Sequence, residues 1–313
     1  MFIISPRIGL CNQLQTIAKG IALSIKYNRN IYINKFQIDL KSGVLTDINN
    51  ILDLKEMNNF LQYTIKTPIK MLNKIDSNII NKLENYYLPN IDYTKMSRMN
   101  YINDIIELNK NMETIYLGNI VSLDVFKSFN CRWDDYTDNN IYNLIMSNIK
   151  FNQIFYKLKD NIKQELNLTT FNCIHLRIED DAIMFFSSCY NLPFEKYNEK
   201  ILNFYNNNIK NLCQDQINKT YLCSGMLEFD NKINFNYYND LMKNNSLLCD
   251  KKNIKLDAYY MHNRELIAII DLLIAYDSDF FVGCHISSFS LAIKCHHAFN
   301  NKKYILFNDN DIL

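Results

Sequence analysis

The sequence FNCIHLRIEDDAIMFFSSC, residues 171–189, carries the clearest structural signal in this chain. A short apolar run, residues 171–174, leads directly into His175, Arg177 and three consecutive acidic residues at 179–181. This abrupt change is typical of a buried strand whose carboxyl end opens into a binding crevice of an α/β sheet. The alternative is a core strand that ends in a solvated, charged loop.

Side-chain alternation along this strand predicts that His175 and Arg177 lie on one side and Leu176 on the other. From there the planar guanidinium of Arg177 can reach a diphosphate, while His175 contacts an adjacent ring or hydroxyl. The same residues also fit a structural role, in which Arg177 pairs with Asp181 and only ties a loop. The spacing alone leaves both interpretations open.

Strand and helix signals alternate in both halves of the chain, which predicts the α/β class. The segment 47–90 carries mixed helical signals, and the polar, Asn-rich segment 225–253 is expected to be a surface excursion. Strands are expected at residues 2–5, 31–33, 114–117, 171–176, 220–223, 280–282 and 304–307, and helices at residues 12–25, 141–149, 151–166, 264–276 and 288–297.

Composition limits the kind of protein this can be. The chain has 313 residues, of which 48% are hydrophobic, so it is expected to fold into two globular domains. The formal net charge of +1 provides no basic field for nucleic acid. The nine cysteines are never spaced as CxxC, which favours reduced thiols over a disulfide framework or zinc site. The opening MFIISPRIG is too short for a signal peptide or membrane span, so a soluble, cytoplasmic protein is expected.

Two further stretches place polar groups at expected helix starts. In DFFVGCHISSFSLAIKCHH, residues 279–297, a strand ends at Gly283, and Ser287 and Ser288 begin the next helix, where N–H groups and the helix dipole favour an anion. In GLCNQL, residues 9–14, either Asn12 or Gln13 can bind a sugar hydroxyl or phosphate. Serines at a helix start are more often simple N-caps, and capping explains Asn12 equally well.

Two metal-like patterns are discounted. Asp277, Ser278 and Asp279 match a DxD motif, but they precede an expected strand, so a turn between helix and strand explains them better. His296 and His297 are adjacent and therefore lie on different helix faces, where they cannot hold one metal together.

Three stretches resemble motifs of the GDP-fucose-dependent protein O-fucosyltransferase family. They are HLRIEDD, DLLIAYDSDFFVGCHISSFS and GLCNQL, and along the chain they follow the order of the family's motifs, with GLCNQL first. The α-1,2-fucosyltransferases share this first motif as GLGNQL. The resemblance covers about 45 residues. Two departures are that Cys11 replaces the family's glycine and that Arg7 lies two residues before the family's arginine.

The resemblance implies a GT-B fold, with two Rossmann-like α/β domains facing across a crevice. It places the acceptor side in residues 1–155 and the nucleotide-sugar donor in residues 156–313, with the last segment able to pack back on the first domain. It also implies an inverting glycosyltransferase that needs no metal or other cofactor and moves fucose from GDP-fucose to a hydroxyl of a protein Ser/Thr or a glycan. The alternatives are transfer from another deoxysugar nucleotide, such as UDP-rhamnose, and a non-catalytic nucleotide- or glycan-binding protein.

The family's residue roles can be carried over by position. Arg177 would be catalytic, stabilising the leaving GDP at the β-phosphate and glycosidic oxygen, and Asp181 would match the Asp downstream of the family's HLR. Donor contacts are expected from His175 to the nucleoside, from Ser287, Ser288 and Phe289 to the diphosphate, from Asp271 to guanine, and from Asn12 to the sugar or acceptor. The general base stays open between Glu179, Asp180, Asp181 and a carboxylate of the first domain.

Overall fold

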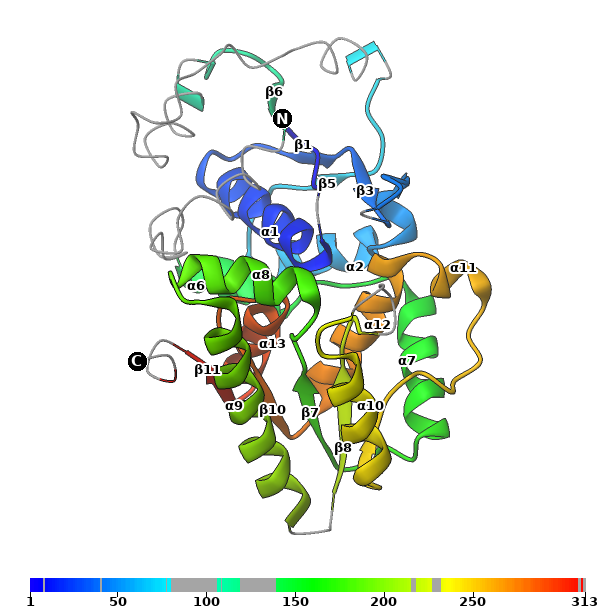
Figure 1. Ribbon diagram of the computed structural model, residues 1–313. Coiled ribbons are helices and arrows are strands. Elements are labelled where there is room, and N and C mark those ends of the chain that lie inside the picture. Colours follow the sequence, from blue (N-terminus) through cyan, green and yellow to red (C-terminus); the bar gives the residue numbers. More distant parts are fainter. Residues whose placement is uncertain are drawn as a thin grey trace. The chain divides into compact units, whose positions relative to one another are not determined.

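The computed structural model describes residues 1–7, 9–39, 41–76, 78–79, 106–107, 109–118, 139–214, 218–226, 232–308 and 311. These residues form two compact units, Met1–Gln153 and Ile154–Leu313. Each unit is built on its own parallel sheet (Figure 1). The chain is therefore an α/β protein with two Rossmann-like units.

The first unit contains a four-stranded parallel sheet in the order β5-β2-β1-β6. Its strands are β1 (Phe2–Ile4), β2 (Ile31–Ile33), β5 (Met71–Leu72) and β6 (Ile115–Gly118), with α1 (Leu10–Lys26) joining β1 to β2. Among the described residues, the other elements of this unit are an antiparallel hairpin of β3 (Lys35–Gln37) and β4 (Leu45–Asp47), then η1 (Ile48–Asn50), α2 (Leu54–Asn59), the π-helix η2 (Phe60–Ile65) and α6 (Asn139–Ser147).

The helix α1 packs closely on this sheet. A Cβ atom added at Gly20 would lie 2.9 Å from the Cδ1 atoms of Ile4 and Ile31, so a larger residue here would force these side chains to shift. The expected N-cap at Asn12 is wrong, because the helix begins at Leu10. Gly9 is the N-cap, with extended backbone (φ −61°, ψ 156°), and its carbonyl accepts a hydrogen bond from Gln13 N. Asn12 therefore lies inside the first turn.

The second unit contains a five-stranded sheet in the order β11-β10-β7-β8-β9, with every pair parallel. The strands are β7 (Phe171–His175), β8 (Lys219–Cys223), β9 (Leu248–Cys249), β10 (Phe280–Cys284) and β11 (Lys303–Phe307). From β7 the chain first builds outward through β8 and β9, then returns to the other side of β7 with β10 and β11. The strand order therefore reverses between β7 and β10, which is where doubly wound sheets bind ligands.

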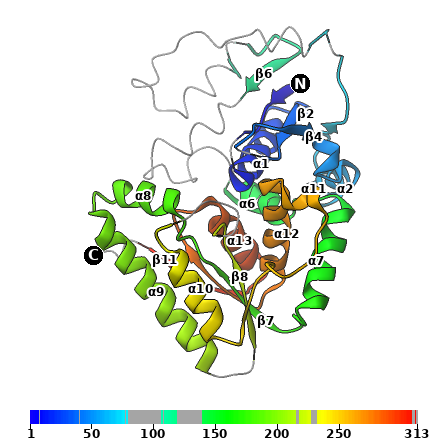
Figure 2. The ribbon, with the colours of Figure 1, turned by 45° about the vertical axis from the view of Figure 1, so that its right-hand side comes forward.

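Helices cover both faces of the second sheet, with α9 and α10 on one face and α12 and α13 on the other (Figure 2). Ile174, Leu222 and Val282 join the core under the first face, where Tyr197 and Tyr205 of α9 are fully buried. The helices of this unit are α7 (Gln153–Glu165, whose first residue ends the first unit), α8 (Asp180–Cys189), α9 (Phe194–Gln214), α10 (Phe235–Asn244), α11 (Ala258–Met261), α12 (Arg264–Asp277) and α13 (Ser288–Phe299).

The structure confirms each expected strand and helix named above to within a few residues. The surface excursion expected at 225–253 is wrong, because α10 and the edge strand β9 lie within it. Residues 80–90 of the segment with mixed helical signals, and residues 227–231, lie outside the described residues. The eight described cysteines are free thiols, and four of them are buried. Within the described part of the chain, no helix combines the length and apolarity needed to cross a membrane.

Candidate active site

The candidate site of the second unit lies at the carboxyl ends of β7 and β10, the neighbouring strands between which the strand order reverses. Residues 175–181, named here the HLR segment, run from the last residue of β7 into the first turn of α8. Residues 285–287 follow β10 and lead into α13. Six of the eight predicted site residues, all except Asp271 and Asn12, lie in these two connections or the first turns of their helices.

His175 ends β7 and is buried against the start of α13. Its Nδ1 atom lies 2.7 Å from Ser290 Oγ, and its ring centroid lies 4.7 Å from that of Phe289. Ser290 Oγ accepts a hydrogen bond from Cys284 N, so its own proton is free to go to Nδ1. Burial, followed by the charges of Arg177 and Lys251, holds the pKa of His175 well below its usual value. We therefore assign a neutral imidazole that carries its proton on Nε2.

Arg177 projects from the HLR segment with a side chain 17% exposed. Its Nη1 donates to Glu179 Oε2 at 2.7 Å, and its two terminal nitrogens lie 3.3 and 3.2 Å from the oxygens of Asp181. The Glu179 carboxylate is buried, whereas that of Asp181 is 64% exposed. Although burial lowers the pKa of Arg177, these two carboxylates outweigh it and raise that pKa. The ion pair between Arg177 and Asp181 expected for a structural role is present, with a second, buried carboxylate added.

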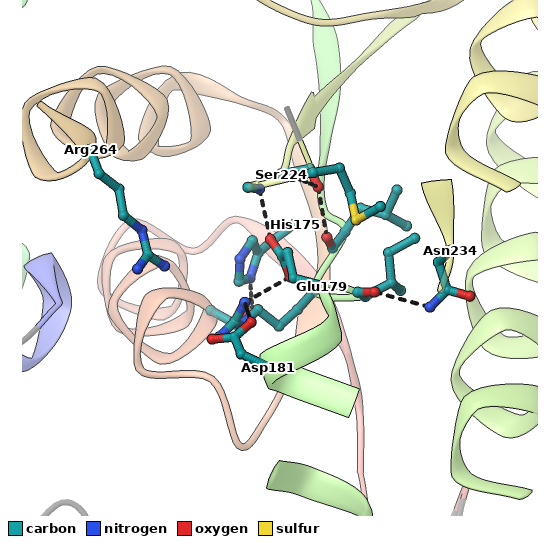
Figure 3. Close-up of polar contacts among 12 residues, drawn as sticks. His175, Glu179, Asp181, Ser224, Asn234 and Arg264 are labelled. Atoms are coloured by element: carbon teal, nitrogen blue, oxygen red, sulfur yellow. Dashed lines mark hydrogen bonds and ion pairs between the residues drawn. The ribbon is translucent and has the colours of Figure 1, made fainter. Parts of the chain in front are cut away.

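The backbone of the HLR segment is held by side chains from other elements (Figure 3). Their bonds are Tyr205 Oη to His175 O (2.8 Å), Ser224 Oγ to Leu176 O (3.1 Å) and Asn234 Nδ2 to Ile178 O (2.9 Å). Leu176 packs in the core with α8 and α9, opposite His175, as alternation predicts. The segment is therefore a rigid platform for Arg177.

Two of the three acidic residues anchor this platform. Glu179 Oε1 accepts from Gly225 N at 2.7 Å, and Asp180 accepts from the backbone N–H groups of Lys232 and Ile233. Both carboxylates lie at the start of α8, where the helix dipole also favours negative charge. Each accepts hydrogen bonds from backbone N–H groups elsewhere in the second unit. Asp181 is the most exposed of the three and faces Arg177.

The start of α13 is shaped by close packing on β10. Ser287 is the N-cap residue, and its side chain makes no capping hydrogen bond, so simple capping does not account for it. Ser288 is half-buried in the first turn. A Cβ atom at Gly283 would lie 2.5 Å from Ser290 Oγ and 2.7 Å from the Phe281 ring, so glycine is required for Ser290 to reach His175.

Asp271 lies in the middle of α12, away from the helix starts. It is buried and forms an ion pair with the buried Lys251, and its Oδ1 accepts from Tyr221 Oη at 2.7 Å. Both carboxylate oxygens are thus bonded within the unit. Sequence reasoning missed Lys251 and Tyr221, because nothing in their local sequence pairs them with a residue 20 or 50 positions further on.

Asn12 and Gln13 belong to the first unit. Gln13 exchanges two 2.8 Å hydrogen bonds with the backbone of Gln37, so its amide fixes α1 to β3. The Oδ1 atom of Asn12 is buried without a hydrogen-bond partner among the described residues. Arg7 Nη1 donates to the carbonyls of Pro6 and Lys35.

The discounted metal patterns have structural partners. Asp277 pairs with Lys159 and Lys163, and Asp279 Oδ2 accepts from Phe171 N, so both flank a turn between α12 and β10 as expected. His297 Nε2 lies 3.0 Å from Ala275 O, whereas the His296 ring stacks on Tyr276 at 4.0 Å. The two histidines face different partners, also as expected.

The buried, neutral state of His175 makes stability depend on pH. Above about pH 7 the imidazole of His175 is neutral in both the folded and the unfolded protein. Below about pH 6.5 His175 of the unfolded chain binds a proton, which the buried site of the folded protein disfavours. Stability should therefore fall as the pH falls. Between about pH 7.5 and 5.5 we expect His175 to account for a loss of up to about 1.4 kcal/mol.

Urea unfolding of the wild type and of His175→Asn at both pH values measures this effect. Asparagine retains an acceptor for Ser290 and does not titrate, and the buried His297, whose pKa burial also lowers, is common to both proteins. An equal pH dependence in the two proteins would show that His175 is protonated as readily in the folded state as in the unfolded chain.

Comparison with known proteins supports the fold described above. No family model matches the chain, and no curated sequence matches it. Among solved structures, POFUT1 in complex with GDP-fucose is similar over 98% of this chain and 97% of its own, with a TM-score of 0.61 and 12% identity. A GDP complex of POFUT1 gives a TM-score of 0.62 at 10% identity, covering 98% of both chains. The fucosyltransferase NodZ from Bradyrhizobium gives 0.51 at 12% identity, covering 99% of this chain and 95% of its own. The chain therefore has the GT-B fold of these fucosyltransferases.

Proposed function

We propose that this protein is an inverting, metal-independent fucosyltransferase, which moves fucose from GDP-fucose to a hydroxyl of a protein Ser/Thr or a glycan. One observation carries the proposal. The HLR segment and the start of α13 lie at the sheet edge where the strand order reverses, within a fold shared with POFUT1, whose structures contain GDP-fucose and GDP.

Arg177 supplies the leaving-group chemistry in this proposal. The acceptor oxygen forms a bond to the anomeric carbon while the bond from that carbon to the β-phosphate oxygen breaks, and its electron pair stays with GDP. A guanidinium held in place before the reaction stabilises this developing charge without reorganisation. The contacts of Glu179 and Asp181 keep Arg177 charged and oriented.

The surrounding residues recognise the nucleotide. The Nε2–H of neutral His175 donates to an oxygen of the nucleoside portion, while Ser287, Ser288 and Phe289 line the diphosphate at the start of α13. The unpartnered Oδ1 of Asn12 accepts from a sugar or acceptor hydroxyl. The hydroxyl proton of the acceptor passes to a carboxylate, which is Glu179, Asp180, Asp181 or a carboxylate of the first unit.

A thermal-shift panel tests the donor. GDP and GDP-fucose, in EDTA, should raise the stability by about 2.7 kcal/mol at 100 times their dissociation constants, whereas UDP and UDP-rhamnose should not. Stabilisation by UDP and not by GDP would show that the donor is a UDP-sugar, such as UDP-rhamnose, instead of GDP-fucose. Tight GDP binding without GDP release from GDP-fucose, with a mixed acceptor library present, would indicate a binding protein. Release that requires an added divalent cation would refute the metal-independent mechanism.

A further inference from the structure

Arg264 occupies an electrostatically unfavourable position, the first residue of α12. The N-terminus of a helix carries partial positive charge, so a cation there is disfavoured, and acidic residues are the usual choice. The helix has Glu265 as the only acidic residue of its first turn, and Nε of Arg264 lies 3.9 Å from Glu265 Oε1. A residue that opposes local preference in this way often serves a ligand.

The side chain of Arg264 is directed toward the candidate site. Figure 3 shows the guanidinium extending from the start of α12 toward His175 and the Asp181 carboxylate. The side chain is 24% exposed, and Asp181 is 64% exposed. Burial raises the pKa of Asp181, but Arg177 and, more weakly, Arg264 outweigh it and lower that pKa. Both guanidinium groups thus act on the same exposed carboxylate.

The side chains around Arg177 supply too little positive charge to bind an anionic ligand. Arg177 contributes one positive charge, and its two carboxylate partners contribute two negative charges. Lys251 is compensated by its buried pair with Asp271, and His175 is neutral. A diphosphate with two or more negative charges therefore meets an edge that lacks positive charge unless another cation takes part.

Resting on the proposed function, we propose that Arg264 is a second anion-binding residue of the donor site, which contacts the diphosphate of the nucleotide sugar together with Arg177. Arginine suits this role because its planar fork binds two phosphate oxygens at once. The same fork can also bind the edge of guanine. The Arg264 side chain extends toward Asp181, the exposed carboxylate partner of Arg177, which favours a contact with the phosphates over a contact with guanine.

Isothermal titration of Arg264→Met with GDP, guanosine and inorganic pyrophosphate tests the inference. Methionine keeps an unbranched side chain that packs like the aliphatic part of arginine, and it removes the charge. We expect a loss of GDP affinity of about 10- to 100-fold, a parallel loss for pyrophosphate, and unchanged binding of guanosine. Arg264→Lys should recover part of the GDP affinity. Lys210→Met, which removes one exposed charge from α9, should bind all three probes as the wild type does.

The outcomes separate the inference from the proposed function. Equal losses for GDP and guanosine would assign Arg264 to the base and overturn the phosphate contact. GDP affinity unchanged in Arg264→Met would overturn the inference while the proposed function stands. A wild-type protein that binds no GDP would overturn both. Circular dichroism of each variant confirms that it is folded, and Arg264→Lys preserves the test if the methionine variant is not.

Discussion

Replacing Arg177 with methionine is expected to lower the kcat of fucose transfer by at least about 100- to 1,000-fold, the usual cost of removing a group that stabilises transition-state charge. The loss should fall mainly on kcat, because the charge on the β-phosphate oxygen is greatest in the transition state. Arg177→Lys should recover only a small part, since an ammonium cannot make the planar two-point contact. Steady-state kinetics with GDP-fucose measures both effects.

The structure shows why this experiment needs a second variant. Glu179 is 2% exposed, so removing Arg177 leaves a buried carboxylate whose one remaining hydrogen bond, within the described part of the chain, is from Gly225 N–H. Breaking a buried pair in this way costs about 3–5 kcal/mol. The double variant Arg177→Met/Glu179→Gln removes both charges and should regain most of that stability without activity. Near-normal turnover in either variant would refute the proposed mechanism.

Replacing Asp271 with alanine is expected to destabilise the protein by about 3–5 kcal/mol, because it leaves the Lys251 ammonium buried without its counter-charge. The double variant Asp271→Leu/Lys251→Met replaces the pair by apolar side chains of similar volume. It should regain most of that loss, but not the cost of about 1–3 kcal/mol for leaving the Tyr221 hydroxyl without its acceptor. Urea unfolding of the two single variants and the double variant gives the coupling between the residues.

The same double variant tests the expected contact between Asp271 and guanine. If the role of the pair is structural, as its burial and its bond to Tyr221 favour, the double variant should bind GDP with wild-type affinity. A loss of GDP affinity greater than about tenfold, with guanosine affected equally, would instead support a guanine contact. Stability unchanged in Asp271→Ala would show that the Lys251 charge finds another partner.

The candidate site could be predicted only in part from the sequence. The opposite directions of His175 and Leu176 follow from the strand's own pleat, and the serines at the start of α13 follow from local helix signals. By contrast, the Glu179 bond to Gly225 joins residues 46 positions apart, and the Arg264 side chain extends toward Asp181 from another element. The helix α10 was missed because its buried positions, Tyr238 and Leu241, are surrounded by asparagines in the sequence.

The sequence by itself determined the α/β class, the order of four of the five strands of the second unit with α7, α12 and α13, and which residues follow β7 and β10, because these depend on periodicity and turn chemistry within a few residues. Only the tertiary structure decided that β7 lies between β8 and β10, that Ser290 bonds His175, and that buried partners hold Arg177 and Asp271. These contacts arise when strands distant in the chain pair and exclude water, so that each buried charge must find a partner that no local pattern specifies.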